Sequence, residues 1–409
     1  MPMPPSLDAL PIDVRVGGRL SALDTRPLPP CAPQVLAFLG ELSQHLLASP
    51  AARTYPDVAA FAYWCRPANL RRVAASQGEG RSAGGTRLGR GLALHFAPAN
   101  VPVNFAFSLV FGMLAGNANV VRLSETRHAQ ADVICAALTQ LLQAPAHRRL
   151  AEMTRVIAYP RNDEVTAALS ALCHVRVLWG GDQTIAHLRR LPIPARCVEV
   201  AFADRYSMCI LGAQAVCDAD TATLAQLVQG FHNDTYTLDQ NACSSPQLVI
   251  WQGEGERIQQ AQQRFWPALA ELVRQRDGLS AVAAVDKFSQ LCSMAMAQPQ
   301  ALVAQRHGNF VYRIPFGELP ADIDQHRGRH GVFSEYGAND LACLATVVAE
   351  KYQTVTCFGV ERQSVVEAIV DAGLPGVDRV VPVGRALDIG VVWDGYDLIG
   401  TMSRVIADV

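Results

Sequence analysis

The chain has 409 residues, of which 50% are hydrophobic and 18% are charged, and its formal net charge is −2 at pH 7. This composition allows a large buried core and excludes an intrinsically disordered chain. The near-neutral charge gives no field that would favour nucleic acid or an acidic membrane surface, so neither is an expected partner. Only two of the 35 basic residues are lysines, Lys287 and Lys351, which leaves few candidates for Schiff-base chemistry.

The N-terminus and the cysteines favour a cytoplasmic location. The first residues, MPMPPSLDALPIDV, contain neither the basic segment nor the apolar segment of a signal peptide. The longest apolar run, residues 105–115, is shorter than the about 18–20 residues that span a bilayer. Eleven cysteines are scattered without a CxxC pair or a Cys/His cluster, which predicts free thiols in a reducing compartment and no metal site.

Strands and helices alternate through the first half of the chain. Residues 1–33 are proline-rich, apolar spacing predicts helical structure over 34–75, and a loop rich in Gly, Ser and Arg follows at 77–91. The predicted strands are 92–96, 119–123, 156–159, 175–179 and 196–202, and the predicted helices are 103–114, 126–143, 164–171 and 183–191. This alternation indicates crossover units around a parallel sheet.

The second half repeats the pattern less regularly. The predicted helices are 219–232, 256–276 and 361–373, and the predicted strands are 247–251, 309–314, 353–358 and 378–383. We place a domain boundary near residues 203–206, because the strand at 196–202 ends there. Two α/β lobes are therefore expected.

Cys243 is the cysteine with the most distinctive context. It lies in a polar loop, Gln-Asn-Ala-Cys-Ser-Ser-Pro, directly before a predicted strand. A nucleophilic thiolate requires a partly exposed position near positive charge or amide donors, and a loop can supply both. Most other cysteines lie inside apolar segments and are expected to be inert; examples are Cys135, Cys173, Cys209 and Cys343. Context alone leaves a nucleophilic and a structural interpretation of Cys243 open.

Two loop segments are further candidates. Asn100 is bracketed by Pro98 and Pro102, which would hold its amide in place as an oxyanion donor, although it would also suit a helix cap. Residues 180–182, Gly-Gly-Asp, follow a strand and open a helix, where glycines let a phosphate approach free N–H groups. The alternative is a tight turn with Asp182 as the N-cap, and its carboxylate would repel a phosphate.

Together and in this order, these segments resemble the aldehyde dehydrogenase superfamily, and most closely its LuxC-type acyl-CoA reductase branch. The segments that carry the resemblance are Pro98–Pro102 (Pro-Trp-Asn-Phe-Pro element), 115–125 (AGN…KPSE element), 177–185 (Gly-Ser turn under the cofactor), 239–251 (nucleophilic cysteine) and 393–404 (Gly-Gly-Tyr stretch). The resemblance covers residues 85–404 and is loose over the first 80 residues.

The resemblance implies an α/β fold of the aldehyde dehydrogenase type. Residues 1–203 would form an N-terminal helical segment and a Rossmann-like NADPH-binding domain, and residues 204–384 a second α/β domain with the catalytic cysteine. Residues 385–409 would close the active site or contact another subunit. A small oligomerisation arm would leave near residues 77–91, which implies a homo-oligomer.

The resemblance also implies NADPH-dependent reduction of a fatty acyl-CoA or acyl-protein thioester to the aldehyde. The acyl group would be carried on Cys243, with Asn100 and the Cys243 backbone N–H as the oxyanion hole, and an acyl-protein synthetase is the implied partner. We keep three alternatives. They are an NAD(P)-dependent aldehyde dehydrogenase that runs in the oxidative direction, a cysteine-dependent thioesterase or acyltransferase without redox turnover, and a non-catalytic cofactor-binding protein.

Glu199 is a candidate acid or base with an uncertain counterpart in the superfamily. Oxidising members use a glutamate in a Leu-Glu-Leu-Gly-Gly stretch to activate water, but residues 198–202 read Val-Glu-Val-Ala-Phe. A reductase has no use for water at the acyl-enzyme. The alternative is a structural carboxylate paired with an arginine such as Arg196 or Arg205.

The residues that the resemblance assigns to the cofactor are Pro98, Ala99, Arg122, Ser124, Glu125, Gly180, Gly181 and Asp182. Arg122 replaces a lysine that contacts the adenosine ribose or its 2′-phosphate, and a guanidinium suits phosphate. Glu125 stands where NAD-preferring relatives bind the ribose hydroxyls, and a carboxylate there would repel a 2′-phosphate. NADPH is favoured, and NADH stays open.

Overall fold

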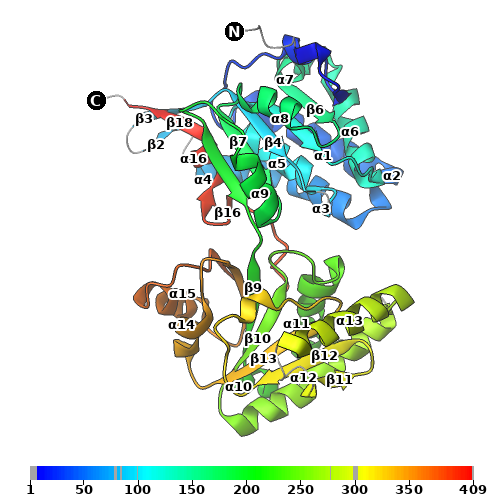
Figure 1. Cartoon of the computed structure of the whole chain (residues 1–409), viewed down its shortest axis with the longest axis vertical. Coiled ribbons are helices and arrows are strands. Elements are labelled where there is room, and N and C mark those ends of the chain that lie inside the picture. Colours follow the sequence, from blue (N-terminus) through cyan, green and yellow to red (C-terminus); the bar gives the residue numbers. More distant parts are fainter. Residues whose placement is uncertain are drawn as a thin grey trace. The chain divides into compact units, whose positions relative to one another are not determined.

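The chain folds into two compact units, which are described one at a time (Figure 1). The computed structural model describes residues 7–77, 81–82, 85–98, 100–276, 278–297 and 303–407. The first unit runs to Ala203 and resumes at Tyr396, and the second unit comprises Asp204–Gly395. The segment that we set apart as 385–409 is therefore divided between the two units at residue 395.

A six-stranded mixed sheet forms the core of the first unit, in the order β1-β6-β5-β4-β7-β8. Its strands are β1 (Asp13–Val16), β4 (Leu92–Phe96), β5 (Ala118–Leu123), β6 (Thr154–Ala158), β7 (Val175–Trp179) and β8 (Val198–Phe202). All neighbouring strands are parallel except β1, which pairs with β6 in the antiparallel sense. The predicted parallel sheet is confirmed, with one antiparallel edge strand that the sequence analysis missed.

The helices between these strands are α5 (Asn104–Leu114), α6 (Ala129–Leu142), α7 (Arg148–Met153), α8 (Asp163–Ser170) and α9 (Asp182–Arg189). The predicted helices match α5, α6, α8 and α9 within about three residues at each end, which is close to the uncertainty of helix boundaries. Gly116 follows α5 with φ +82°, the left-handed conformation expected of a helix C-cap. The alternating apolar pattern therefore located this half of the fold correctly.

The predicted helical stretch over residues 34–75 is interrupted three times. It consists of α1 (Pro33–Ala48), α2 (Pro50–Arg53), α3 (Pro56–Trp64) and α4 (Pro67–Ser76). Each helix begins at a proline, because proline lacks an N–H and clashes with the preceding turn, yet is well suited to the first helical position. The predicted stretch is therefore helical, as four successive helices.

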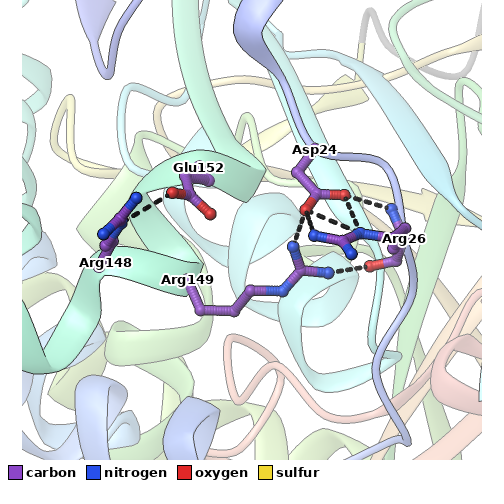
Figure 2. Close-up of polar contacts among 5 residues, drawn as sticks. All are labelled: Asp24, Arg26, Arg148, Arg149 and Glu152. Carbon is purple, nitrogen blue, oxygen red and sulfur yellow. Dashed lines mark hydrogen bonds and ion pairs between the residues drawn. The ribbon is translucent and has the colours of Figure 1, made fainter.

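The segment before α1 is tied to α7 by a network of charged side chains (Figure 2). The carboxylate of Asp24 accepts hydrogen bonds from Arg26 and Arg149, and Arg149 also donates to the Arg26 carbonyl at 2.7 Å. The Asp24 N–H donates to the carbonyl of Glu152 at 2.9 Å. These contacts hold the N-terminal segment against the outer part of the first sheet.

A small three-stranded sheet, in the order β18-β3-β2, completes the first unit. Its strands are β2 (Arg81–Ser82), β3 (Gly85–Gly89) and β18 (Ser403–Ile406). Strand β18 pairs with β3 so that Ser403 lies opposite Gly89, which returns the C-terminal segment to this unit. The region predicted as a loop at 77–91 therefore contains two strands, although residues 78–80 and 83–84 lie outside the described chain.

The second unit is built on a seven-stranded sheet, in the order β11-β12-β13-β10-β9-β14-β15, in which only β11 is antiparallel to its neighbour. Its strands are β9 (Tyr206–Gly212), β10 (Pro246–Gln252), β11 (Gln305–His307), β12 (Val311–Phe316), β13 (Val332–Ala338), β14 (Tyr352–Phe358) and β15 (Arg379–Pro382). Its helices are α10 (Ala213–Asp218), α11 (Thr221–Thr235), α12 (Gly255–Arg276), α13 (Ala281–Ala297), α14 (Leu344–Val347) and α15 (Arg362–Asp371).

Both faces of this second sheet are buried. Met208 and Ile210 of β9 pack into a cluster with residues of α13, α14 and α15, whereas Cys209 and Leu211 pack against α11 and α12. Strand β9 has the continuous apolar run of a strand buried on both faces, as β4 and β7 do, but it directly follows the predicted domain boundary at 203–206 and was not predicted. Strand β13 was missed as well, because it contains the charged residue Glu335.

Glu335 is buried in β13 and has a complete set of partners. Its carboxylate accepts hydrogen bonds from Arg313 and from the indole N–H groups of Trp251 and Trp266, each at 2.7 Å. These partners come from distant segments, so the neutralisation of this charge cannot be read from the local sequence.

No helix of the described residues is long and apolar enough to cross a membrane.

Candidate active site

Cys243 lies in a loop that its neighbours hold firmly. The loop enters through Asp239 (φ +50°) and Gln240 (φ +62°), two left-handed residues that reverse the chain after α11. The buried Gln240 side chain accepts from the N–H of Gly331 at 3.0 Å and donates to the carbonyl of Val332 at 2.9 Å. The loop is thereby fixed to the segment that begins β13.

The backbone of Cys243 is also anchored to the sheet. Its carbonyl accepts a hydrogen bond from Ser207 Oγ of β9 at 2.7 Å. The Ser207 hydroxyl in turn accepts from the N–H of Thr354 in β14 at 3.1 Å. Next to it, Ser245 Oγ donates to the carbonyl of Asp234 in α11 at 2.7 Å. The backbone of Cys243 is therefore held in place by hydrogen bonds that run through Ser207 to two paired strands, β9 and β14.

The Cys243 thiol faces a polar pair, Gln353 and Asp394. Gln353 Nε2 lies 3.4 Å from Sγ and also donates to Asp394 Oδ1. Arg205 Nε lies 3.9 Å from the same Asp394 oxygen, and Arg205 forms an ion pair with Asp378. Arg205, Cys243, Gln353 and Asp378 stand at or just before the amino ends of β9, β10, β14 and β15, which one edge of a parallel sheet brings together. Asp394 reaches the same group from the turn after β16 (Val392–Trp393).

The surroundings of Cys243 favour the thiol over the thiolate. Burial raises the pKa of Cys243, and the Asp394 carboxylate raises it further, whereas Gln353, Arg327 and Arg205 lower it. Burial likewise raises the pKa of Asp394 above its ordinary value. Cys243 is therefore protonated near neutral pH in this conformation, and formation of the thiolate must be assisted when it reacts.

The other cysteines are free thiols as well, as expected from their scattered positions. Five are buried, namely Cys65, Cys135, Cys173, Cys209 and Cys357, whereas Cys292 on α13 is exposed. Among the residues that the structure describes, no group of three or more His, Cys, Asp or Glu side chains is arranged to hold a metal ion.

Asn100 lies in the first unit, exposed in the loop between β4 and α5. The N-cap of α5 is Val103, so the alternative that Asn100 caps this helix is wrong. Asn100 and Cys243 belong to different units, and a joint oxyanion hole stays a prediction.

A shallow pocket opens at the carboxyl ends of β4, β5 and β6 in the first unit. Its lining includes Pro98 and Ser124 of the predicted cofactor set, together with Arg15, Arg127 and Asp132. Arg15 is paired with Asp13 at 2.7 Å, and Asp132 belongs to the first turn of α6. The Arg127 guanidinium and the N-terminus of α6 are the groups of this lining that suit a phosphorylated ligand.

The remaining predicted cofactor residues differ in their surroundings. The Arg122 guanidinium donates to the carbonyl of Tyr159 at 3.2 Å and lies over the Tyr159 ring. Glu125 is exposed, and Ala99 lies outside the described residues. The Arg122 guanidinium therefore already has a partner in Tyr159, and a ligand would be bound by its remaining N–H groups.

The glycine turn after β7 has an open face. Gly181 is the N-cap of α9, which corrects the alternative that Asp182 would cap this helix; Asp182 is its first residue. A Cβ built at Gly181 would meet no atom within 4 Å, whereas one at Gly180 would approach Thr184 at 3.3 Å. The space beside Gly181 fits the predicted approach of a ligand to the backbone.

Glu199 has both carboxylate oxygens occupied. Arg176 Nε donates to Oε2 at 2.8 Å, and Arg189 Nε donates to Oε1 at 2.6 Å. The arginines named in the sequence analysis, Arg196 and Arg205, are not these partners. The contacts favour the structural alternative, since an acid or base needs a free oxygen to exchange a proton.

The paired α/β units define an aldehyde dehydrogenase-like fold. An NAD-dependent benzaldehyde dehydrogenase from Corynebacterium glutamicum superposes with a TM-score of 0.59 and 12% identity, over 92% of this chain and 84% of that one. A 1-pyrroline-5-carboxylate dehydrogenase from Thermus with bound NAD gives 0.57 and 14%, over 93% and 82%. An NADP-dependent glyceraldehyde-3-phosphate dehydrogenase from Bacillus halodurans gives 0.56 and 16%, over 92% and 86%.

The sequence identifies the family within this fold. Residues 66–405 match the profile of the family described as acyl-CoA reductase (LuxC), so the chain belongs to that family of enzymes. It is also 24% identical over 171 residues to the long-chain acyl-protein thioester reductase of Vibrio harveyi. That match spans 40% of this chain and 33% of the relative. The resemblance stated from the sequence is confirmed.

Proposed function

We propose that this protein reduces an acyl thioester, carried either by CoA or by a protein, to the aldehyde with NADPH as the reductant. The observation that carries the proposal is Cys243, which is fixed by backbone hydrogen bonds beside an amide donor in a chain of the acyl-CoA reductase family. The Vibrio harveyi relative acts on long-chain acyl-protein thioesters by its name, which supports the same substrate class here.

In the proposed reaction, Cys243 gives up its proton, and the thiolate attacks the acyl carbonyl. The C–S bond to the carrier breaks, the carrier thiol leaves with a proton, and the acyl group stays on Cys243 as a thioester. NADPH, when bound, supplies the hydride that reduces this thioester. The resulting thiohemiacetal on Cys243 collapses with breakage of its C–S bond, which releases the aldehyde, and one proton from the solvent restores the Cys243 thiol.

The oxyanion of both steps is assigned to two donors, the Asn100 side-chain amide and the Cys243 backbone N–H. A donor aimed at such an oxyanion contributes about 3 kcal/mol to transition-state stabilisation. Glu199 is not needed for this reaction, since no water is activated. We therefore propose that its contacts with Arg176 and Arg189 give it a structural role.

For the cofactor we propose the set Pro98, Ala99, Arg122, Ser124, Glu125, Gly180, Gly181 and Asp182. The pocket beside Ser124 supports this assignment, because it places the guanidinium of Arg127 where it suits the phosphates. The known structures with bound NAD and NADP share the fold and leave the choice of nicotinamide open. We favour NADPH for its 2′-phosphate, which the arginines suit.

Two assemblies belong to the proposal. The small sheet of β2, β3 and β18 stands where an oligomerisation arm was expected, which supports a homo-oligomer built through it. An acyl-protein synthetase is the proposed partner that hands over the acyl group if the donor is a protein thioester.

The experiment follows NADPH and NADH oxidation by the purified protein across a series of acyl-CoA lengths, with aldehyde measured as the product. We expect acyl-CoA-dependent NADPH oxidation with one aldehyde formed per NADPH. Loss of acyl-CoA without nicotinamide oxidation would instead identify a thioesterase or acyltransferase. Activity only with an aldehyde and NAD(P)⁺, independent of CoA, would identify an oxidising dehydrogenase.

A further inference from the structure

We infer that Gln353 is a catalytic residue that donates a hydrogen bond to the Cys243 thiolate, and that Asp394 is the positioning residue that orients its amide. The inference deepens the proposed function and rests on Cys243 as its nucleophile. Gln353 lies outside the segments that carry the family resemblance, in a strand 110 residues further along the chain than Cys243, whereas Asp394 lies in the segment 393–404.

The orientation of the Gln353 amide follows from its neighbours. A carboxylate can only accept hydrogen bonds, so the side of the amide that faces Asp394 must be its NH₂ group. That group has two N–H bonds, and one is directed to Asp394 while the other reaches Cys243 Sγ at 3.4 Å. At the other end, Gln353 Oε1 accepts from Thr354 Oγ1 at 3.2 Å. Both N–H bonds and the oxygen of the Gln353 amide therefore have partners.

Burial strengthens the hydrogen bond between Gln353 and the Cys243 thiolate, because the local dielectric is low. Gln353 is fully buried at the amino end of β14, and the Asp394 side chain is 4% exposed. Cys243 itself is half-buried, so its sulfur anion would lose part of its hydration, and a fixed N–H donor compensates for that loss. Gln353 therefore stabilises the charged form of the nucleophile before and after the acyl group is carried.

Asp394 has a double effect. It sits in a left-handed conformation, φ +49°, which aspartate tolerates better than most residues and which brings its carboxylate to Gln353. Its negative charge opposes ionisation of Cys243, while Arg205, Arg327 and Arg379 are the positive groups that face the thiol. The pair thus gives a predicted signature, since removing the Gln353 donor and removing the Asp394 charge must act on Cys243 in opposite directions.

The test is the pH dependence of alkylation of Cys243 by iodoacetamide in the full-length protein, followed by mass spectrometry of the peptide that contains Cys243. Alkylation requires the thiolate and no turnover, so its midpoint reports ionisation directly. For Gln353→Leu we expect the midpoint to rise by roughly one pH unit. For Asp394→Asn, which keeps an oxygen for the Gln353 amide, we expect a fall of similar size.

Matched controls are Gln363→Leu and Asp371→Asn on α15, both exposed, for which we expect an unchanged midpoint. Gln353→Met keeps the length of the side chain without a hydrogen-bond donor, and we expect it to raise the midpoint as well. It tests the inference even if the Gln353→Leu variant does not fold. An unchanged or lowered midpoint in the Gln353 variants, or an unchanged or raised one in Asp394→Asn, overturns the inference. If the shifts occur but acyl-CoA is never reduced, the proposed function fails and this inference stands.

Discussion

The amide nitrogen of Gln353 lies 3.4 Å from the Sγ of Cys243, although 110 residues separate the two in the chain. Their meeting follows from the parallel sheet of the second unit, in which β10 and β14 flank β9 and begin at the same edge. The nucleophile is therefore defined by strand pairing as much as by its own loop.

Asn100→Ala is expected to lower kcat for acyl-CoA reduction by roughly 100- to 1,000-fold, because one oxyanion donor is lost. KM should change little, since the donor acts on charge that develops during the reaction. Steady-state kinetics with NADPH oxidation as the signal would check this. Asn233→Ala on the exposed side of α11 is the matched control, and equal kinetics of the two variants would remove Asn100 from the mechanism.

Arg127→Gln is expected to raise KM for NADPH by roughly tenfold and to leave KM for NADH nearly unchanged. The reason is that Arg127 lines the pocket at the carboxyl ends of the first sheet, where its charge suits a 2′-phosphate. The comparison of both nicotinamides in one assay checks this, with the exposed Arg161→Gln as control. A similar loss for NADH and NADPH would assign Arg127 to a phosphate common to both.

The two lysines of the chain make a natural pair for a stability test. Lys287 Nζ is buried and donates to the carbonyls of Asn309, Phe310 and His330, each at 2.9 Å, whereas Lys351 is partly exposed and pairs with Asp204. Lys287→Met removes the donor of the Asn309 and His330 carbonyls, while the Phe310 carbonyl keeps the Tyr236 hydroxyl at 3.0 Å, and should lower the free energy of unfolding by roughly 3 kcal/mol. Lys351→Met should cost less than about 1 kcal/mol. Urea unfolding of both variants checks the contrast, and equal losses would contradict it.

The network around Asp24 predicts a pH dependence of stability (Figure 2). The hydrogen bonds from Arg26, aided by Arg149, hold the pKa of Asp24 below its ordinary value. A carboxylate with a lowered folded pKa stabilises the protein above its unfolded pKa of about 4, and this contribution is lost as the pH falls below that value.

Asp24→Asn should accordingly show a smaller drop in Tm than the unmodified protein when the pH is lowered from about 5 to about 3. Thermal unfolding at a series of pH values measures the difference, with the exposed Asp371→Asn as the comparison. Parallel curves for the Asp24 variant and the unmodified protein would mean that the network contributes nothing to acid stability.

The secondary-structure elements that were predicted correctly are those marked by a local apolar pattern and by the residues that end it. Strands β4 and β7 were located residue for residue, because short apolar runs end at Ala97-Pro98 and at Gly180-Gly181. Strand β9, an apolar run of the same kind that directly follows the predicted domain boundary, was not predicted. Within the helical stretch predicted over 34–75, the breaks were missed, because the prolines at 50, 56 and 67 each restart a helix.

The site divides in the same way. Cys243 was found from its own loop, since a cysteine between polar residues before a strand is unusual. Gln353 was missed, because its contact with Cys243 depends on the pairing of β14 with β9 and of β9 with β10, and these strands lie far from it in the sequence. Its only local signal is an amide side chain inside an otherwise apolar strand, Tyr-Gln-Thr-Val-Thr-Cys-Phe. The partners of Glu199 were misassigned for the same reason, because Arg176 reaches it from the neighbouring strand β7.

The central claim is that acyl reduction passes through an acyl group on Cys243. The most direct measurement is a single-turnover reaction with excess protein and a fatty acyl-CoA, with and without NADPH, in which acylation of Cys243 is followed by mass spectrometry. The account predicts acyl-Cys243 and one equivalent of free CoA without NADPH, its conversion to aldehyde when NADPH is added, and neither event in Cys243→Ala. Aldehyde formation by Cys243→Ala at the rate of the unmodified protein, or NADPH oxidation without an acylated Cys243, would contradict it.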